Sequence, residues 1–398
     1  MFEQMAMAPP DSILGLTEAF KKDPNQKKIN LGVGVYQDEG GNTPILSSVK
    51  KAEKILLDVE NTKNYLPIQG PAEYGTAVRG LLFGAGSELV NSGRAQTAQT
   101  PGGTGALRVA GDFLKKLAPQ ATVWMSNPTW ANHKGIFGAA GLKSADYPYY
   151  DAQNKSLDLQ GMLKAIGQMP QGDVILLHGS CHNPTGMDPT PAQWDQIAQA
   201  VWARGLMPVI DFAYQGLAEG IEEDAYAVRL FTQAGREALV CSSFSKNFGL
   251  YRERVGALTG IGADADAAEK AFSNIKIAIR QNYSNPPCHG GAIVTTILSD
   301  AALTQEWIGE VAAIRNRIHE MRQLFVDSLQ AKGIKGDFSF IVRQHGMFSF
   351  SGLSDAQVAR LRDQHAIYMV AGGRMNVAGM TRANMATLID AVAEVLAD

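Results

Sequence analysis

Apolar positions in this chain gather in short runs that alternate with helical patterns from about residue 98 onward. Four runs are almost continuously apolar and end in polar or glycine-rich sequence, namely residues 121–128, 173–180, 206–213 and 237–244. Strands with this pattern are buried on both faces, as in a parallel sheet covered by helices. The pattern therefore predicts an α/β fold, and such open sheets bind ligands at the carboxyl ends of their strands.

Helical patterns separate these runs. Residues 190–205 place apolar side chains close to positions i, i+3 and i+4, and the pattern stops at Gly205. The longest pattern covers residues 304–333, and we expect it to begin with Thr304 as its cap and to end at Gly333. Its roughly 28 residues would extend about 42 Å, which is long enough to leave one domain and enter another.

The long helical pattern indicates a second, smaller domain. After it, residues 337–353 and 366–380 are expected to be strands with a helix between them, as in a small α+β domain. The N-terminal segment lacks strand–helix alternation and is expected to join this domain. We therefore predict a large domain over residues 48–305 and a small domain formed by residues 1–47 and 306–398.

Composition narrows the classes of protein and partner. The chain has 398 residues, 45% of them hydrophobic and 19% charged, and a net charge of −3. This balance is typical of a globular protein and gives no reason to expect nucleic acid or an anionic membrane as a partner. Three widely spaced cysteines and no apolar run near 18 residues favour the cytoplasm. No C-x-x-C or H-E-x-x-H pattern occurs, so no metal site is expected.

A glycine-rich turn, Gly102-Gly103-Thr104-Gly105, stands directly before an amphipathic helical pattern. Backbone N–H groups at the start of a helix attract anions, and glycines let a phosphate approach closely. The turn is not a dinucleotide fingerprint, because Arg108 stands where a third glycine would be needed. On this segment alone, a phosphate site and a cap without a ligand are equal alternatives.

Polar and aromatic residues follow two other apolar runs. Asp211 ends one run and Tyr214 comes three residues later, so the carboxylate either caps the next helix or pairs with a cationic nitrogen of a ligand. Trp130 and His133 follow another run, where the tryptophan is either a plug of the core or a flat surface for a planar ligand.

Two histidines, His178 and His182, lie four residues apart and would suit a metal if they were helical. The strand pattern and Pro184 argue against a helix. The following Asn-Pro-Thr-Gly stretch indicates a turn.

Lys246 is the most informative single residue. Lysines are mostly solvated surface charges, but this one follows an apolar run and lies between Ser245 and Phe248. A partly desolvated lysine has a lowered pKa, which makes its neutral amine a nucleophile. Arg254 follows closely, so a carbonyl ligand that carries a phosphate would suit this segment.

These features match one ligand when they are combined. A phosphate cradle, a reactive lysine, a carboxylate for a ring nitrogen and an aromatic surface fit pyridoxal 5′-phosphate (PLP). A Schiff-base lysine and an acidic partner for the pyridinium nitrogen are marks of PLP enzymes.

Three motifs carry a resemblance to a known family: "CHNPTG" (181–186), "SFSKNFGLYRERVG" (243–256) and "NYSNPP" (282–287). With these motifs the chain resembles the aspartate and aromatic amino acid aminotransferases, which are PLP enzymes of fold type I, from residue 11 to residue 380. The resemblance implies a large domain with a mostly parallel seven-stranded sheet flanked by helices, and a smaller α+β domain.

The resemblance implies a role for each polar residue near the cofactor. Lys246 would form the Schiff base and move a proton between the substrate Cα and the cofactor. Asp211 would keep the ring nitrogen protonated, with His133 as its support, and Trp130 would stack on the ring. Tyr214, Asn183 and Tyr65 would also contact the cofactor. The phosphate would be bound by Gly102, Gly103, Thr104, Ser243, Ser245 and Arg254.

The resemblance also implies how the substrate binds. Arg374 would clamp the α-carboxylate and Arg280 the distal carboxylate, because a guanidinium can hold a carboxylate by two parallel hydrogen bonds. Gly34, Trp130 and Asn183 would also line the substrate site. Arg280 and Tyr65 would reach across from a second subunit, so a homodimer is implied.

The sequence therefore predicts a PLP-dependent transaminase that moves the amino group of aspartate to 2-oxoglutarate in two half-reactions. An aromatic amino acid transaminase with the same acceptor stays open as the alternative. A non-catalytic regulator would lack Lys246 or carry a DNA-binding segment. Decarboxylation or elimination fits less well, because two arginines that fix both carboxylates favour loss of the Cα proton.

Overall fold

A computed structural model describes residues 1–7 and 14–397. The chain divides into a larger unit, residues 44–183 and 187–316, and a smaller unit, residues 1–43, 184–186 and 317–398. The domain boundaries at 47/48 and 305/306 stay predictions. Residues 11–13, where the family resemblance begins, lie outside the described residues.

The larger unit alternates helices and strands. Its helices are α2 (Ser47–Val59), α3 (Ala72–Phe83), α4 (Glu88–Asn91), α5 (Gly102–Leu117), α6 (Asn132–Ala139), α7 (Leu159–Gln168), α8 (Pro191–Arg204), α9 (Tyr226–Phe231), α10 (Ala265–Asn282) and α11 (His289–Ser299). Its strands are β2 (Ala95–Pro101), β3 (Thr122–Asn127), β4 (Lys143–Pro148), β5 (Tyr150–Asp151), β6 (Ser156–Leu157), β7 (Val174–His178), β8 (Met207–Phe212), β9 (Ala238–Ser243) and β10 (Val255–Ile261).

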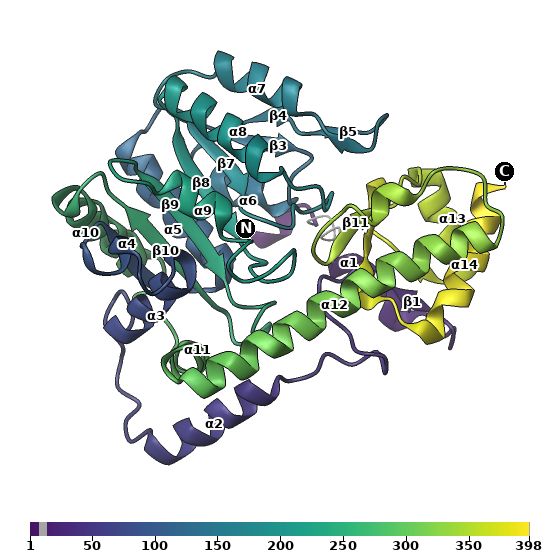
Figure 1. Ribbon diagram of the computed structural model, residues 1–398, viewed down its shortest axis with the longest axis horizontal. Coiled ribbons are helices and arrows are strands. Elements are labelled where there is room, and N and C mark those ends of the chain that lie inside the picture. The colour runs from purple at the N-terminus through teal and green to yellow at the C-terminus, as the bar shows by residue number, and fades with distance from the viewer. Residues whose placement is uncertain (8–13, 398) are drawn as a thin grey trace. The chain divides into compact units, whose positions relative to one another are not determined.

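Seven of these strands form one sheet in the order β2-β10-β9-β8-β7-β3-β4, with the helices around it (Figure 1). Strands β9, β8, β7, β3 and β4 are parallel to one another. Strand β10 is antiparallel to both of its neighbours, β2 and β9. The four strands predicted from continuous apolar runs are confirmed as β3, β7, β8 and β9. The predicted fold class, a mostly parallel sheet flanked by helices, is confirmed as well.

The core of the larger unit explains why these strands read as continuous apolar runs. Side chains of β3, β7, β8, β9 and β10 pack in one cluster with α5 and α10, including Leu107, Phe113, Val123, Leu176 and Ile275, all of them buried. Strands β7, β8 and β9 are buried on both faces, so their polar residues lie toward the strand ends. The parallel register then sets His178 beside Asp211 on neighbouring strands.

The smaller unit carries two short sheets. It contains α1 (Leu14–Lys22), β1 (Ile29–Asn30), β11 (Phe348–Phe350), α13 (Asp355–His365), β12 (Ile367–Tyr368), β13 (Arg374–Asn376) and α14 (Arg382–Leu396). Strand β1 pairs in parallel with β12, and β11 pairs antiparallel with β13. The N-terminal segment is thereby tied to the C-terminal part of the chain.

The strands expected over 337–353 and 366–380 are present only as the short strands β11, β12 and β13. Turns and short 3-10 helices such as Ser339–Ile341 interrupt both ranges, and β11 and β13 have only three residues each. Glycines with positive φ interrupt the extended backbone, including Gly346 at 75° and Gly372 at 80°. The helix expected between them is confirmed as α13.

The long helix α12 spans Ala301–Ala331, from the larger unit into the smaller one. The expected cap, Thr304, is wrong: the Asp300 carboxylate accepts from the backbone N–H of Leu303, and the Thr304 hydroxyl donates to the carbonyl of Ile297. An aspartate is the stronger cap, because its charge also suits the helix N-terminus. In the described part of the chain, no helix combines the length and the apolar character of a membrane span.

Candidate active site

The turn that carries Lys246 follows β9 directly. Its Nζ lies 4.9 Å from the centroid of the Tyr214 ring. Burial lowers the pKa of Lys246 to about 8; the nearby carboxylate of Asp211 opposes this shift, and the positive charge of Arg254 reinforces it. In this environment a substantial fraction of the amine is neutral, and thus nucleophilic, near neutral pH.

Hydroxyl and guanidinium groups gather beside this turn. The Ser243 hydroxyl donates to Ser245 Oγ at 3.2 Å, and Arg254 Nη1 donates to the same oxygen at 3.3 Å. Ser243 and Ser245 are both buried. Three donors with one fixed positive charge form a setting for an anion with several oxygens.

The glycines of α5 bring its N-terminus against these groups. A Cβ at Gly102 would lie 2.6 Å from Arg254 Nη2, and a Cβ at Gly103 would lie 3.0 Å from Ser243 Cβ. Gly102 also has φ of 73°, which a side chain disfavours. The N-cap residue of α5 is Pro101, which makes no side-chain cap hydrogen bond. The N–H groups of the first turn, which includes Thr104, have no acceptors within the helix. The turn is therefore suited to a phosphate.

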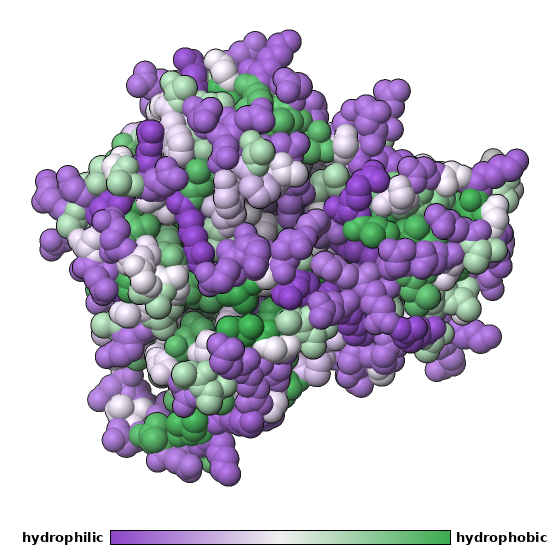
Figure 2. Space-filling view, viewed as in Figure 1, coloured by the Kyte–Doolittle hydropathy of each residue, from purple (hydrophilic) through white to green (hydrophobic). Residues whose placement is uncertain are grey.

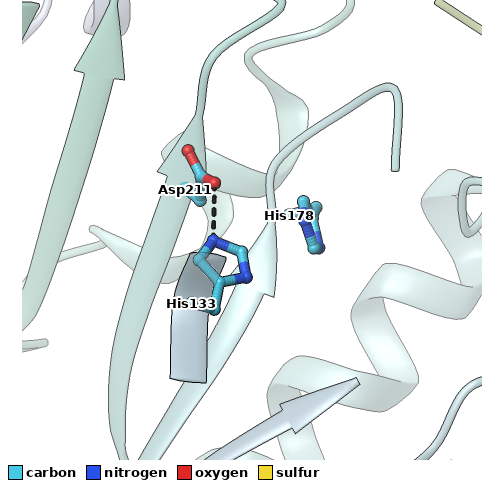
Figure 3. A group of neighbouring side chains, drawn as sticks. All are labelled: His133, His178 and Asp211. Atoms are coloured by element: carbon cyan, nitrogen blue, oxygen red, sulfur yellow. Dashed lines mark hydrogen bonds and ion pairs between the residues drawn. The ribbon is translucent and has the colours of Figure 1, made fainter. Parts of the chain in front are cut away.

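A buried carboxylate lies at the end of β8. Asp211 Oδ2 accepts a hydrogen bond from His133 Nε2 at 2.9 Å (Figure 3). Thr129 Oγ1 lies 2.8 Å from His133 Nδ1. Burial alone would raise the pKa of Asp211, but the hydrogen bond from His133 and the nearby positive charge of Lys246 help to lower it below its ordinary value. Asp211 therefore stays ionised, and it can hold a protonated ring nitrogen.

His178 faces the same pair. The ligand atoms of His133, His178 and Asp211 all lie within 4.8 Å of one another (Figure 3). Burial lowers the pKa of His178 to about 3, so its ring is neutral. A metal ion would have to replace the hydrogen bond between His133 and Asp211, so the arrangement fits a supported carboxylate better than a metal centre.

Two residues of the "CHNPTG" motif lie close to these groups. Asn183 Nδ2 donates to the hydroxyl of Tyr214 at 3.4 Å. The ring of His182 stacks on Tyr149 at 3.9 Å, and its Nε2 lies 2.9 Å from the Ser126 hydroxyl. Asn183 and Tyr214 are therefore brought together, whereas His182 supports the loop.

Trp130 stands on the other side of His133. Its ring meets that of His133 edge to face at 5.2 Å, and the side chain is partly buried against the core. Trp130 thus packs against the core, and its role as a surface for a planar ligand stays a prediction.

The smaller unit holds Gly34 and Arg374. Arg374 Nη2 donates to the carbonyl of Gly32 at 2.7 Å, and its guanidinium lies 4.3 Å from the centroid of the Phe348 ring. A Cβ at Gly34 would lie 2.9 Å from Phe348 Cζ. Gly34 and Arg374 therefore flank the same aromatic ring, and Arg374 is buried and fixed in orientation.

Among residues 1–7 and 14–397, no contact brings Tyr65 or Arg280 to the Lys246 turn. Tyr65 is 92% exposed. Arg280 is exposed near the end of α10, where it donates to the hydroxyl of Ser284.

These residues fit PLP by their chemistry. The anion setting, the amine with a lowered pKa, the ionised carboxylate and the phenol all come from consecutive strand ends of the larger unit. The absent side chains at Gly102 and Gly103 leave room that a Cβ would fill.

Sequence reasoning missed the place of His178 beside Asp211 and the contact of Thr129 with His133. The run that ends at His178 does contain a usable signal, because in-register parallel strands place equivalent ends side by side. Nothing in the sequence pattern points to Thr129.

Comparisons with known proteins cover nearly the whole chain. The sequence profile described as "Aminotransferase class I and II" matches residues 26–392. The chain is 56% identical over 396 residues to an aspartate aminotransferase of Escherichia coli strain K12, with all of both chains covered. It is 48% identical over 397 residues to an aromatic-amino-acid aminotransferase of Pseudomonas aeruginosa, covering 100% of this chain and 99% of the relative.

A solved structure is similar over the same length. The crystal structure of an aromatic-amino-acid aminotransferase from Burkholderia pseudomallei, covalently bound to pyridoxal phosphate, matches with a TM-score of 0.97 at 48% identity. The match covers 100% of this chain and 99% of that one.

Proposed function

This chain belongs to the class I and II aminotransferases, and from this premise we propose that it uses PLP to transfer the amino group of L-aspartate to 2-oxoglutarate. The products are oxaloacetate and L-glutamate. Aspartate aminotransferases at 53–56% identity support this choice of substrate. The observation that carries the proposal is the partly buried Lys246 amine, with its pKa lowered to about 8, beside an ionised carboxylate and an anion setting.

The residues of the larger unit would hold each part of the cofactor. Arg254, Ser243 and Ser245, with the N–H groups at the start of α5, would bind the phosphate. Lys246 would hold the aldehyde carbon covalently, and Asp211 would accept a hydrogen bond from the protonated ring nitrogen. When bound, PLP supplies an electron sink for the negative charge that develops at the substrate Cα.

Lys246 has a second task once the substrate amine has displaced it. Its neutral amine would accept the proton from the substrate Cα, and the resulting ammonium would donate that proton to the cofactor carbon that carries the amino group at the end of the half-reaction. A pKa near 8 suits both directions, because neither protonation state is strongly favoured near neutral pH. The ring of Tyr214 lies 4.9 Å from Nζ and limits where the amine can swing.

Asn183 and Tyr214 would act on the ring oxygen of the cofactor. The amide of Asn183 already donates to the Tyr214 hydroxyl, so that hydroxyl is oriented and can donate its own proton. Trp130 would stack on one face of the cofactor ring. It also contacts His133, the residue that hydrogen-bonds to Asp211.

Two arginines would bind the carboxylates of the substrate. Arg374 is oriented by the carbonyl of Gly32 and the ring of Phe348, and its guanidinium would hold the α-carboxylate. Arg280 would bind the distal carboxylate. Gly34 would keep the backbone close to the substrate, because a side chain there would meet Phe348.

We also propose that the protein is a homodimer with shared sites and that it works in the cytoplasm. Tyr65 and Arg280 are exposed in the single chain. Hydrophobic residues gather on the surface over α2 (Figure 2), where Leu57 and Val59 are 82% and 63% exposed. Such a patch favours an interface, and a second subunit would place Tyr65 and Arg280 against a neighbouring site.

An aromatic amino acid transaminase is the second candidate, because relatives with that name are 48% identical over the full length. Measuring kcat/KM for aspartate, phenylalanine and tyrosine with 2-oxoglutarate separates the two. We expect aspartate to give the highest value. A higher value for phenylalanine or tyrosine would establish the aromatic activity instead.

Arg280→Ala sharpens this comparison. The loss of one guanidinium–carboxylate pair should lower kcat/KM for aspartate on the order of 10²- to 10³-fold. The value for phenylalanine, which has no distal carboxylate, should change little. Equal losses for both substrates would remove Arg280 from the distal-carboxylate role.

A further inference from the structure

The residues that follow Lys246 and Tyr214 in sequence are bonded to each other. Asn247 Nδ2 donates to the backbone carbonyl of Gln215 at 3.2 Å. Asn247 is 1% exposed and Gln215 is 2% exposed, so the bond is shielded from water. One buried hydrogen bond therefore joins the backbone on either side of the contact between the amine and the phenol ring.

Trp307 lies in the part of helix α12 that belongs to the larger unit, and it contacts the two residues that follow Lys246. Trp307 Nε1 donates to the carbonyl of Asn247 at 2.8 Å. The Trp307 ring also stacks on Phe248, with ring centroids 4.4 Å apart and planes 16° from parallel. Trp307 is completely buried. The two residues after Lys246 are thus held by one side chain, through a hydrogen bond and a ring contact.

The loop on the other side of the link is also fixed. Gln215 Nε2 donates to the carbonyls of Leu81 and Ile221, at 3.1 and 3.0 Å. The carboxylate of Asp224 accepts from the backbone N–H groups of Gly216, Ala218, Glu219 and Gly220. Asn247 consequently bonds to a carbonyl that has little freedom to move.

We propose that Asn247 and Trp307 are positioning residues that set the place of the Lys246 amine over the Tyr214 ring, an inference that rests on the proposed function for its catalytic meaning. Buried Asn247 Oδ1 has no hydrogen-bond partner among the described residues, which costs stability. An apolar residue would fill the same space without this cost, so packing alone does not account for an asparagine at position 247. The hydrogen bond from Asn247 Nδ2 to the carbonyl of Gln215 does account for it.

The position of the Lys246 amine determines its pKa. Asp211, Arg254 and the ring of Tyr214 face Lys246, and burial is the largest influence on its pKa. A loosened turn would let water reach the amine, so the pKa would rise from about 8 toward its ordinary value of 10.5. A misplaced amine would also slow proton transfer, since an error of about 1 Å can cost on the order of 10²-fold.

Two variants and one matched control test the proposal. Trp307→Phe keeps a flat ring against Phe248 but removes the donor to Asn247, and Asn247→Ala removes the donor to Gln215. Trp194→Phe is the control, because Trp194 is a buried tryptophan of α8 that meets Phe231 edge to face. Each variant is first compared with the unaltered chain in thermal unfolding.

The first readout needs no catalysis. The full chain without PLP is labelled with a trace amine-reactive reagent across pH 6 to 11, as a scan of about five units around the lysine range, and the extent at Lys246 is measured by peptide mapping. We expect a midpoint near 8 for the unaltered chain and for Trp194→Phe. The midpoint should rise by about half a unit or more in Trp307→Phe and Asn247→Ala.

The second readout uses the PLP-loaded enzyme. The kcat for aspartate should fall about 10- to 100-fold in both variants, whereas KM should change less than about threefold. Unchanged labelling midpoints and kcat in a folded Trp307→Phe would overturn the proposal, even if Asn247→Ala does not fold. Failure of the unaltered chain to bind PLP would instead overturn the proposed function.

Discussion

At the scale of single residues, the chemistry depends on one amine in an unusual setting. The pKa of Lys246 is lowered to about 8 because the side chain is buried, and Arg254 adds to the shift while Asp211 limits it. The protonated amine is not a nucleophile, so loading of the cofactor-free chain with PLP should be slow below pH 8. The rate should rise through a half-maximum near pH 8 and level off above it.

The absorbance of the loaded protein, followed over time at each pH, measures this rate. Lys143→Ala is a suitable control, because Lys143 is an exposed residue of the edge strand β4. A rate that keeps rising to about pH 10.5, the ordinary value for lysine, would contradict the account.

The lowered pKa of Lys246 also predicts how the stability of the fold changes with pH. The folded pKa lies below the unfolded one, so the unfolded chain binds the proton more tightly between about pH 8 and 10.5. The contribution of Lys246 to the free energy of unfolding of the cofactor-free chain should therefore increase as the pH rises through that window. Lys246→Met should remove the gain, as denaturant titrations at pH 8 and pH 10 would measure; an unchanged pH dependence would contradict it.

At the scale of elements, helix α8 shows how local sequence sets a boundary. Thr190 accepts from the backbone of Gln193, the Gln193 side chain accepts from the backbone of Thr190, and Pro191 occupies the first turn. The helix ends at Gly205, whose φ of 67° is left-handed. The apolar spacing and Gly205 predict the helix over 190–205, whereas the cap at Thr190 and the position of Pro191 are further signals that this prediction does not use.

Thr190→Ala should lower the free energy of unfolding by about 1 kcal/mol, because the first turn loses its side-chain acceptor. Urea unfolding monitored by circular dichroism measures the change. Thr190→Ser is the control, since it keeps the hydroxyl and should cost much less. Equal losses in the two variants would show that the methyl group, rather than the cap, matters.

The same physics explains what the sequence predicts and what it does not. Strands β7, β8 and β9 are continuous apolar runs because both of their faces are buried, whereas one face of β3 is only partly buried. Helix α8 carries its own caps. The short strands β11 and β13 lack such signals, since residues 337–380 also contain glycines that turn the backbone. Strand β10 is antiparallel, a property that an apolar run alone does not encode.

Some residues of the candidate site can be identified from the sequence and others cannot. Lys246 and Asp211 were identifiable because each polar group follows an apolar strand. Trp307 was not, since a tryptophan within a helical pattern reads as core, and its bond to Asn247 joins positions 60 residues apart in sequence. Contacts of this kind depend on the folded arrangement of distant segments.

At the scale of the whole molecule, the proposed sharing of sites makes a prediction about mixed subunits. Lys246→Ala and Arg280→Ala each impair every site of their own dimer. If Arg280 serves the neighbouring subunit, a hybrid of the two has one site with both defects and one intact site. An equal mixture that exchanges subunits freely should then recover about a quarter of the normal aspartate activity.

Aspartate turnover after joint refolding of the two variants measures this recovery, and sedimentation of the unaltered protein gives its assembly state. Each variant refolded alone is the control. A mixture no more active than Arg280→Ala alone would place Arg280 in the site of its own chain. A monomer in sedimentation would remove the shared site altogether.

The most direct measurement for the whole account is the site of the covalent bond to PLP. Borohydride reduction of the PLP-loaded protein, followed by peptide mapping, fixes the cofactor to the side chain that holds it. The account predicts the pyridoxyl group on Lys246, with no label in the Lys246→Ala variant. A label on another lysine, or none in the unaltered chain, would contradict it.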